Sequence, residues 1–219
     1  MAIKASEVNK LRQQTGAGMM DCKNALVETN GDFEAAVDVL RKKGQKVAAK
    51  RGDNDAREGI IIAQSSTDSK AGVIVTLNCE TDFVAKNDGY VQLVQSLVDL
   101  ALDKQPKSLD ELKTLAYNEK LSVTEKITEQ IGVLGEKLDL SAYTLVESNQ
   151  VVAYNHPGNQ LATLVALNSA SDIAEDAGKQ VAMQVAAMNP MAVSKDGIDS
   201  KTIEREIEGQ HYFQPIFEK

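Results

Sequence analysis

The stretch that decides the fold of the N-terminal part is Leu11-Arg12-Gln13-Gln14-Thr15-Gly16-Ala17-Gly18-Met19-Met20-Asp21-Cys22-Lys23. The Gly-Ala-Gly at its centre separates two apolar patterns of helical spacing, so the stretch predicts two helices joined by a tight turn. The first helix is predicted over residues 7–14, with Ser6 as its N-cap. The second is predicted over residues 20–29.

A third helix follows, so residues 4–51 predict a three-helix unit. Asn30-Gly31 ends the second helix. Asp32 caps the third, whose basic end, Arg41-Lys42-Lys43, complements the helix dipole. The predicted apolar faces of the second and third helices consist of Met20, Ala25 and Leu26, and of Phe33, Ala36, Val37 and Leu40. The polar, charged segment 50–58 then predicts a linker.

Beyond the linker the pattern changes to short β-rich runs that alternate with helices. Runs rich in Ile and Val, bounded by Ser, Asp and Lys, are typical of strands joined by turns. The predicted strands lie at 59–63, 72–78, 142–146, 151–154 and 161–167, and the predicted helices at 91–102, 107–115, 123–134, 172–188 and 199–208. The rhythm of two strands and a helix occurs twice, which suggests a weak duplication.

Charge is distributed unevenly along the 219 residues, whose formal net charge is -8. Residues 1–57 hold eleven Lys/Arg and eight Asp/Glu, whereas the remaining 162 hold thirteen and twenty-four. The acidic remainder argues against free nucleic acid as a direct partner, because phosphate binding needs a basic surface. The basic N-terminal part suits an acidic protein partner, although an ordinary solvated helix surface has the same composition.

Several classes of protein are disfavoured. No run reaches the roughly 18 apolar residues of a membrane span, and the start lacks the apolar core of a signal peptide. Cys22 and Cys79 lack metal-type spacing and suit reduced, cytoplasmic thiols. A Cys/His hydrolase would need one of them beside His156 or His211 with an orienting group. There is also no GxxxxGK[ST] loop, so the chain itself should not bind a nucleotide through a P-loop. We expect no enzymatic active site, no cofactor and no metal.

Three motifs resemble the signatures of the elongation factor Ts family, in the same order and spacing. The stretch 11–23 is similar to the first signature, and Thr81-Asp82-Phe83-Val84-Ala85-Lys86-Asn87 to the second. His156-Pro157-Gly158, followed by Leu161-Ala162-Thr163-Leu164-Val165, resembles the third. Three motifs in register make a chance match unlikely, and the resemblance spans roughly residues 3–208.

The resemblance implies an α+β fold. It predicts an N-terminal ubiquitin-associated-like three-helix domain and a core of two related α/β subdomains with small antiparallel sheets. The corresponding segments are 1–51 for the three-helix domain, 52–58 for the linker, 59–139 and 140–198 for the subdomains, and 199–219 for the start of a helical hairpin and a divergent tail. Because the match fades after residue 208, we expect the second subdomain to be incomplete.

The resemblance also implies a function and a partner. Family members are guanine-nucleotide exchange factors that bind elongation factor Tu and promote GDP release by disturbing its Mg²⁺/phosphate site during translation elongation. Thr81, Asp82, Phe83 and Val84 match the segment that the family inserts into this partner. Without the resemblance, Phe83 would be interpreted as a core aromatic at a strand–helix junction.

Two further contacts are implied. Arg12, Met19 and Met20 match the surface that binds the partner's G domain. A plainer interpretation is that Met20 belongs to the core, that Met19 is incidental and that Arg12 is a solvated surface residue. His156 lies in a region that the family places near the partner, although a lone histidine in a turn is more often structural.

Alternative functions and contacts stay open. The chain is also interpretable as a docking module that binds elongation factor Tu without efficient exchange, or as an adaptor for ubiquitin-like proteins. The signature at 81–87 argues against the adaptor. No direct nucleic acid or membrane is expected as a partner. Self-association through residues 140–219 is expected, unless the apolar tail at 212–217 covers the incomplete subdomain.

Overall fold

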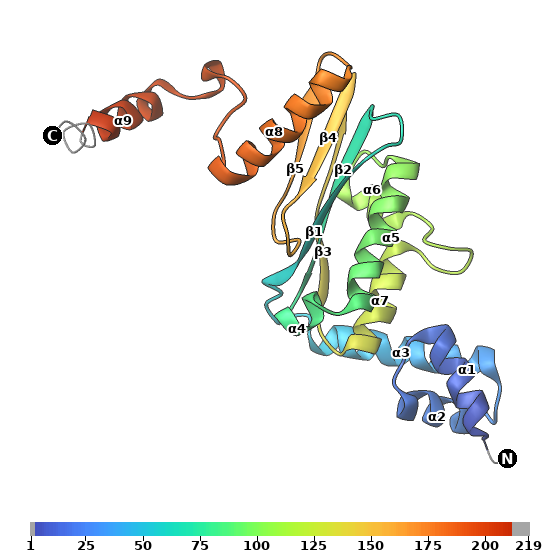
Figure 1. Cartoon of the computed structure of the whole chain (residues 1–219). Coiled ribbons are helices and arrows are strands. Elements are labelled where there is room, and N and C mark those ends of the chain that lie inside the picture. The colour runs from blue at the N-terminus through green and yellow to red at the C-terminus, as the bar shows by residue number, and fades with distance from the viewer. Residues whose placement is uncertain (1–2, 212–219) are drawn as a thin grey trace.

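In the computed structural model, which describes residues 3–211, three helices form the N-terminal end of the molecule (Figure 1). They are α1 (Ala5–Thr15), α2 (Met19–Glu28) and α3 (Phe33–Lys50). We call α1, α2 and the first half of α3 the head. Its small aliphatic core includes Leu11, Leu26 and Ala36, each with no exposed surface.

The start of α1 differs from the prediction, because Ser6 lies inside the helix and not at its N-cap. Lys4 occupies that position, and its backbone N–H donates to the Glu7 carboxylate over 2.7 Å. A carboxylate in the first turn also complements the helix dipole. At the other end, Gly16 adopts a φ of 72° and donates its N–H to the Arg12 carbonyl, a left-handed cap that favours glycine.

The apolar face predicted for the second helix was wrong in one residue. The buried side chains of α2 are Cys22, Ala25 and Leu26, whereas Met20 is 62% exposed. Cys22 is three and four residues from the other two, so all three share one helical face. Met20 is five residues from Ala25 and is rotated away from it by roughly 140°.

The second half of α3 packs on the body of the molecule and crosses α7 (Val123–Leu134). Glycines meet at the crossing, where a Cβ on Gly132 would lie 2.6 Å from the Gly44 Cα. Val47 and Ala48 then contact the core beneath the first sheet. One continuous helix therefore carries the head and also belongs to the packing of the body.

The first sheet has the antiparallel order β1–β2–β3, with β1 (Glu58–Ser65), β2 (Ala71–Cys79) and β3 (Leu138–Glu147). The helices α5 (Asp88–Lys104), α6 (Leu109–Thr114) and α7 follow the short α4 (Asp82–Ala85). The core combines β-branched and aliphatic residues of the sheet with those of the helices, including Val73, Val75, Leu77, Leu97, Leu112 and Val123.

The run 142–146 was predicted in the second subdomain, and this assignment was wrong. It belongs to β3, which starts at Leu138 and pairs with β2 throughout its length. Leu138 and Leu140 are buried in the core beneath this sheet, so the apolar pattern fixes the partner strand. We therefore propose that the first core subdomain extends to Glu147.

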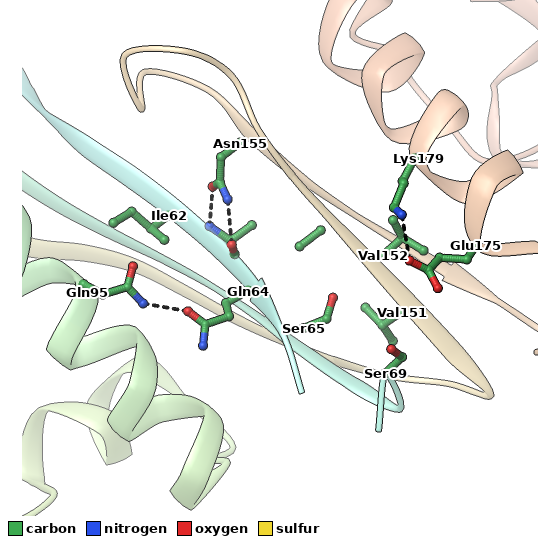
Figure 2. Close-up of a pocket in the computed structure, with 12 residues that line it drawn as sticks. Ile62, Gln64, Ser65, Ser69, Gln95, Val151, Val152, Asn155, Glu175 and Lys179 are labelled. Atoms are coloured by element: carbon green, nitrogen blue, oxygen red, sulfur yellow. Dashed lines mark hydrogen bonds and ion pairs between the residues drawn. The ribbon is translucent and has the colours of Figure 1, made fainter. Parts of the chain in front are cut away.

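The second sheet is the hairpin of β4 (Gln150–Asn155) and β5 (Ala162–Leu167), covered by α8 (Asp172–Met188). Thus the predicted α+β class with N-terminal helices and small antiparallel sheets is confirmed. Asn155 joins this hairpin to the first sheet, since its side-chain amide donates to the Ala63 carbonyl and accepts from the Ala63 N–H (Figure 2). This pairing covers part of the outer edge of β1.

The chain then continues through a 3₁₀ turn (Lys195–Gly197) to α9 (Ser200–His211), which extends away from both sheets (Figure 1). The apolar tail with Tyr212, Phe213, Ile216 and Phe217 lies outside the described residues. Across residues 3–211, none of the helices combines the length and apolar character needed to cross a membrane.

Candidate partner-binding site

An exposed aromatic side chain marks the single helical turn between β2 and α5. We call residues 81–85 the Phe83 turn. Phe83 is 82% exposed, whereas the neighbouring Val84 and Ala85 are buried in the core. Residues on one short turn thus separate into an inward pair that anchors it and an outward aromatic. The interpretation of Phe83 as a core residue was therefore wrong.

Local hydrogen bonds explain why the chain turns here. Thr81 is the N-cap of α4, and its hydroxyl accepts the Val84 N–H over 3.4 Å. Asn87 caps the following α5 in the same way, since its side-chain oxygen accepts from the N–H groups of Gly89 and Tyr90. Two N-caps in close succession start α4 and then α5, which leaves Phe83 at a protruding corner between β2 and α5.

Asp82 adds a negative charge beside the aromatic ring. Its carboxylate accepts from the Lys86 ammonium over 2.6 Å, and both side chains are largely exposed. The hydrogen bond from Lys86 and the positive charge of Lys86 together lower the pKa of Asp82. The carboxylate is therefore ionised at neutral pH and is accessible to a partner.

The base of the Phe83 turn is held by groups that the sequence prediction missed. Thr81 donates both its backbone N–H and its hydroxyl to Glu136, and Glu80 accepts from Arg51 at the end of α3. The only sequence signal for Glu80 is its place directly before the second signature. Glu136 and Arg51 are too distant in the chain for any local pattern to connect them to it.

The head presents the second predicted contact surface. Arg12 on α1 is exposed, and Met19 and Met20 at the start of α2 are 46% and 62% exposed. The turn between these helices is held from inside, because the Cys22 thiol contacts the Ala17 carbonyl at 3.6 Å. Arg12 in the last turn of α1 and Met19 and Met20 in the first turn of α2 thus lie on either side of one glycine-containing turn, as exposed groups. Flexible, polarisable Met side chains suit adaptable interfaces.

The third predicted contact, His156, lies on the loop between β4 and β5. It is exposed, and its Nδ1 atom lies 2.9 Å from the Tyr154 hydroxyl. Its backbone N–H donates to the Leu161 carbonyl, so the loop closes as a hairpin. The same loop is attached to the start of β1, because the Asn159 carbonyl accepts from the Ile61 N–H at 2.8 Å and the Gln160 side chain donates to the Gly59 carbonyl at 3.1 Å.

The geometry of the thiols gives no support to a Cys/His hydrolase. Cys22 and Cys79 are fully buried. Burial raises the pKa of the Cys79 thiol, and this thiol donates to the Thr81 carbonyl over 3.1 Å. A buried, protonated thiol is a poor nucleophile. His211 is the last described residue of α9, and its side chain lies outside the description.

Comparison with known proteins supports the motif-based prediction. Residues 80–214 match the family model described as Elongation factor TS. The chain is 52% identical over 206 residues to elongation factor Ts of Christiangramia forsetii, covering 94% of this chain and 74% of the relative. It is 51% identical over 210 residues to elongation factor Ts of Amoebophilus asiaticus, covering 94% and 75%. On this similarity, the chain belongs to the elongation factor Ts family.

Proposed function

We propose that this protein is a guanine-nucleotide exchange factor that binds elongation factor Tu and promotes GDP release during translation elongation. The observation that carries the proposal is the Phe83 side chain, 82% exposed on a turn that the body holds in place. A large apolar side chain in this setting contributes nothing to its own core, and its burial becomes available to a partner.

The proposed mechanism needs no covalent chemistry. A P-loop GTPase holds GDP through backbone N–H groups and through Mg²⁺ at the phosphates. Burial of one Phe side chain in such a partner is worth about 2–3 kcal/mol. That free energy offsets the displacement of the elements that hold the Mg²⁺ site. Asp82 is ionised and adjacent, so it competes for cations and hydrogen-bond donors there.

The head supplies a separate docking surface in this proposal. Arg12, Met19 and Met20 contact the G domain of the partner, and His156 is a fourth proposed contact from the second sheet. Because the binding free energies of the two ligands are linked, a factor that weakens the binding of GDP to elongation factor Tu is bound more weakly, to the same extent, when GDP is present. Rebinding of nucleotide therefore releases the factor for another round.

Stopped-flow release of fluorescent GDP from elongation factor Tu tests the function directly. We expect the release rate to rise with the concentration of this chain and to saturate. Docking without acceleration would instead support the alternative of a binding module. Absence of docking would contradict both functions.

A further inference from the structure

A cluster of hydrogen bonds joins three distant segments at the base of the Phe83 turn. The Glu80 carboxylate accepts from the Arg51 guanidinium at 2.9 and 2.7 Å, from the Asn54 amide at 2.9 Å and from the Lys137 N–H at 2.6 Å. Its side chain is only 15% exposed. We call Arg51, Asn54, Glu80, Thr81, Glu136 and Lys137 the polar hub.

Within the hub, Glu136 holds the residue that directly precedes α4. Its two carboxylate oxygens accept from Thr81, one from the backbone N–H at 3.0 Å and one from the hydroxyl at 2.7 Å. The same hydroxyl accepts the Val84 N–H. A single side chain thus orients the backbone and the cap of the Phe83 turn. Hydrogen bonds to a carboxylate are the stronger class.

The hub also links this turn to the helix that carries the head. Arg51 is the C-cap residue of α3. Lys137 strengthens the connection, because its ammonium donates to the carbonyls of Gly52 at 2.7 Å and Asn54 at 2.8 Å. The start of the predicted linker is therefore tied to the body, and the head and Phe83 are attached to one polar cluster.

The hub is not needed to define the sheet. Cys79 pairs with Leu138 in the β2–β3 register, and both are buried in the apolar core. The four residues of α4, in contrast, are too few to form a stable helix alone, because nucleation is costly and short helices depend on tertiary contacts. The direction of Phe83 therefore depends on tertiary contacts: burial of Val84 and Ala85 fixes which side of the turn faces the core, and the hydrogen bonds from Thr81 to Glu136 fix its start.

We propose that Glu136 is a positioning residue for nucleotide exchange, holding Thr81 so that Phe83 is presented to the partner in one orientation. Glu80, bound by Arg51, sets that orientation relative to the head. The proposal rests on the proposed exchange function and deepens it. Glu136 acts through Phe83, so its removal reduces the maximal rate of GDP release more than the strength of docking.

A double-mutant cycle in the stopped-flow assay tests this inference, using Phe83→Ala, Glu136→Ala and the double variant. We expect Glu136→Ala to lower the saturating rate about tenfold, because even a small displacement of a positioned group can lower a rate by at least this factor. Its half-saturating concentration should change less than about threefold. Glu136→Gln keeps one carbonyl oxygen for the Thr81 hydroxyl and should recover part of the rate. Glu119→Ala, at an exposed carboxylate, is the control.

The double variant separates positioning from general stability. If Glu136 acts only through Phe83, adding Glu136→Ala to Phe83→Ala lowers the rate by less than about twofold. Multiplicative losses, or a normal rate for Glu136→Ala when Phe83→Ala is impaired, would overturn the inference and leave the exchange function standing. A parental rate for Phe83→Ala would instead refute the insertion mechanism itself. Should Glu136→Ala fail to fold by circular dichroism, the same cycle with Glu136→Gln decides.

Discussion

Replacement of Phe83 by alanine should impair exchange without weakening the fold. The side chain is 82% exposed, so its removal from the free chain should change the free energy of unfolding by less than about 0.5 kcal/mol. Burial of a Phe is worth about 2–3 kcal/mol. Since most of its surface is still available for burial by a partner, roughly 2 kcal/mol of transition-state stabilisation should be lost. This corresponds to a decrease of about 30-fold in kcat/KM for GDP release.

The assay measures release of fluorescent GDP from elongation factor Tu over a range of factor concentrations, so that the saturating rate and the half-saturating concentration are obtained separately. The head is unchanged in this variant, so the saturating rate should fall more than docking weakens. Ile173→Ala is a matched control, because this side chain is 84% exposed on α8, on the second sheet. Asp82→Ala should have a smaller effect, as exposed ion pairs contribute little.

The result that refutes this reasoning is a folded Phe83→Ala protein with the parental rate of GDP release. Equal losses in Phe83→Ala and Ile173→Ala would also refute it, because they would show a nonspecific dependence on exposed apolar surface. A loss confined to the half-saturating concentration would assign Phe83 to docking alone.

Three further predictions concern packing, pH and association. Gly132→Ala should lower the free energy of unfolding by about 1–3 kcal/mol, seen in urea denaturation, because the new Cβ would overlap Gly44; Gly18→Ala, with ordinary spacing around it, is the control. Burial opposes ionisation of Glu80, but hydrogen bonds from its hub partners dominate and lower the pKa of its carboxyl below the ordinary 4.5. The parental protein should therefore be more stable than Glu80→Gln by a constant amount between about pH 6 and 8, and this difference should be lost as the pH falls through the lowered pKa. A difference between the two denaturation midpoints that stays the same at every pH would contradict this. We also expect concentration-dependent self-association in light scattering, because the six residues of β5 carry no charge or proline and α8, which packs on β5, exposes apolar side chains. Val181→Lys should weaken this self-association. A monomer at every concentration would contradict the prediction.

The sequence by itself determined the elements whose signals are local. The helices predicted at 123–134 and 172–188 are confirmed as α7 and α8 with the same bounds. Ser122 and Glu125 form a capping box at the start of α7, and Pro190 follows the end of α8. Caps and apolar periodicity act within a few residues, so a single sequence contains them in full. Each of the three motifs is likewise a short continuous stretch, so the sequence was enough to identify the family.

Tertiary structure alone decided how distant segments combine. The run 142–146 has the same β character as 151–154, and only the burial of Leu138 and Leu140 assigns β3 to the first sheet. The hydrogen bonds between Thr81 and Glu136 join residues 55 positions apart, so no local pattern predicts them. Exposure follows the same rule. Whether Phe83 packs inside or points outward depends on the core that Val84 and Ala85 enter, and that core exists only when strands and helices from several parts of the chain have assembled.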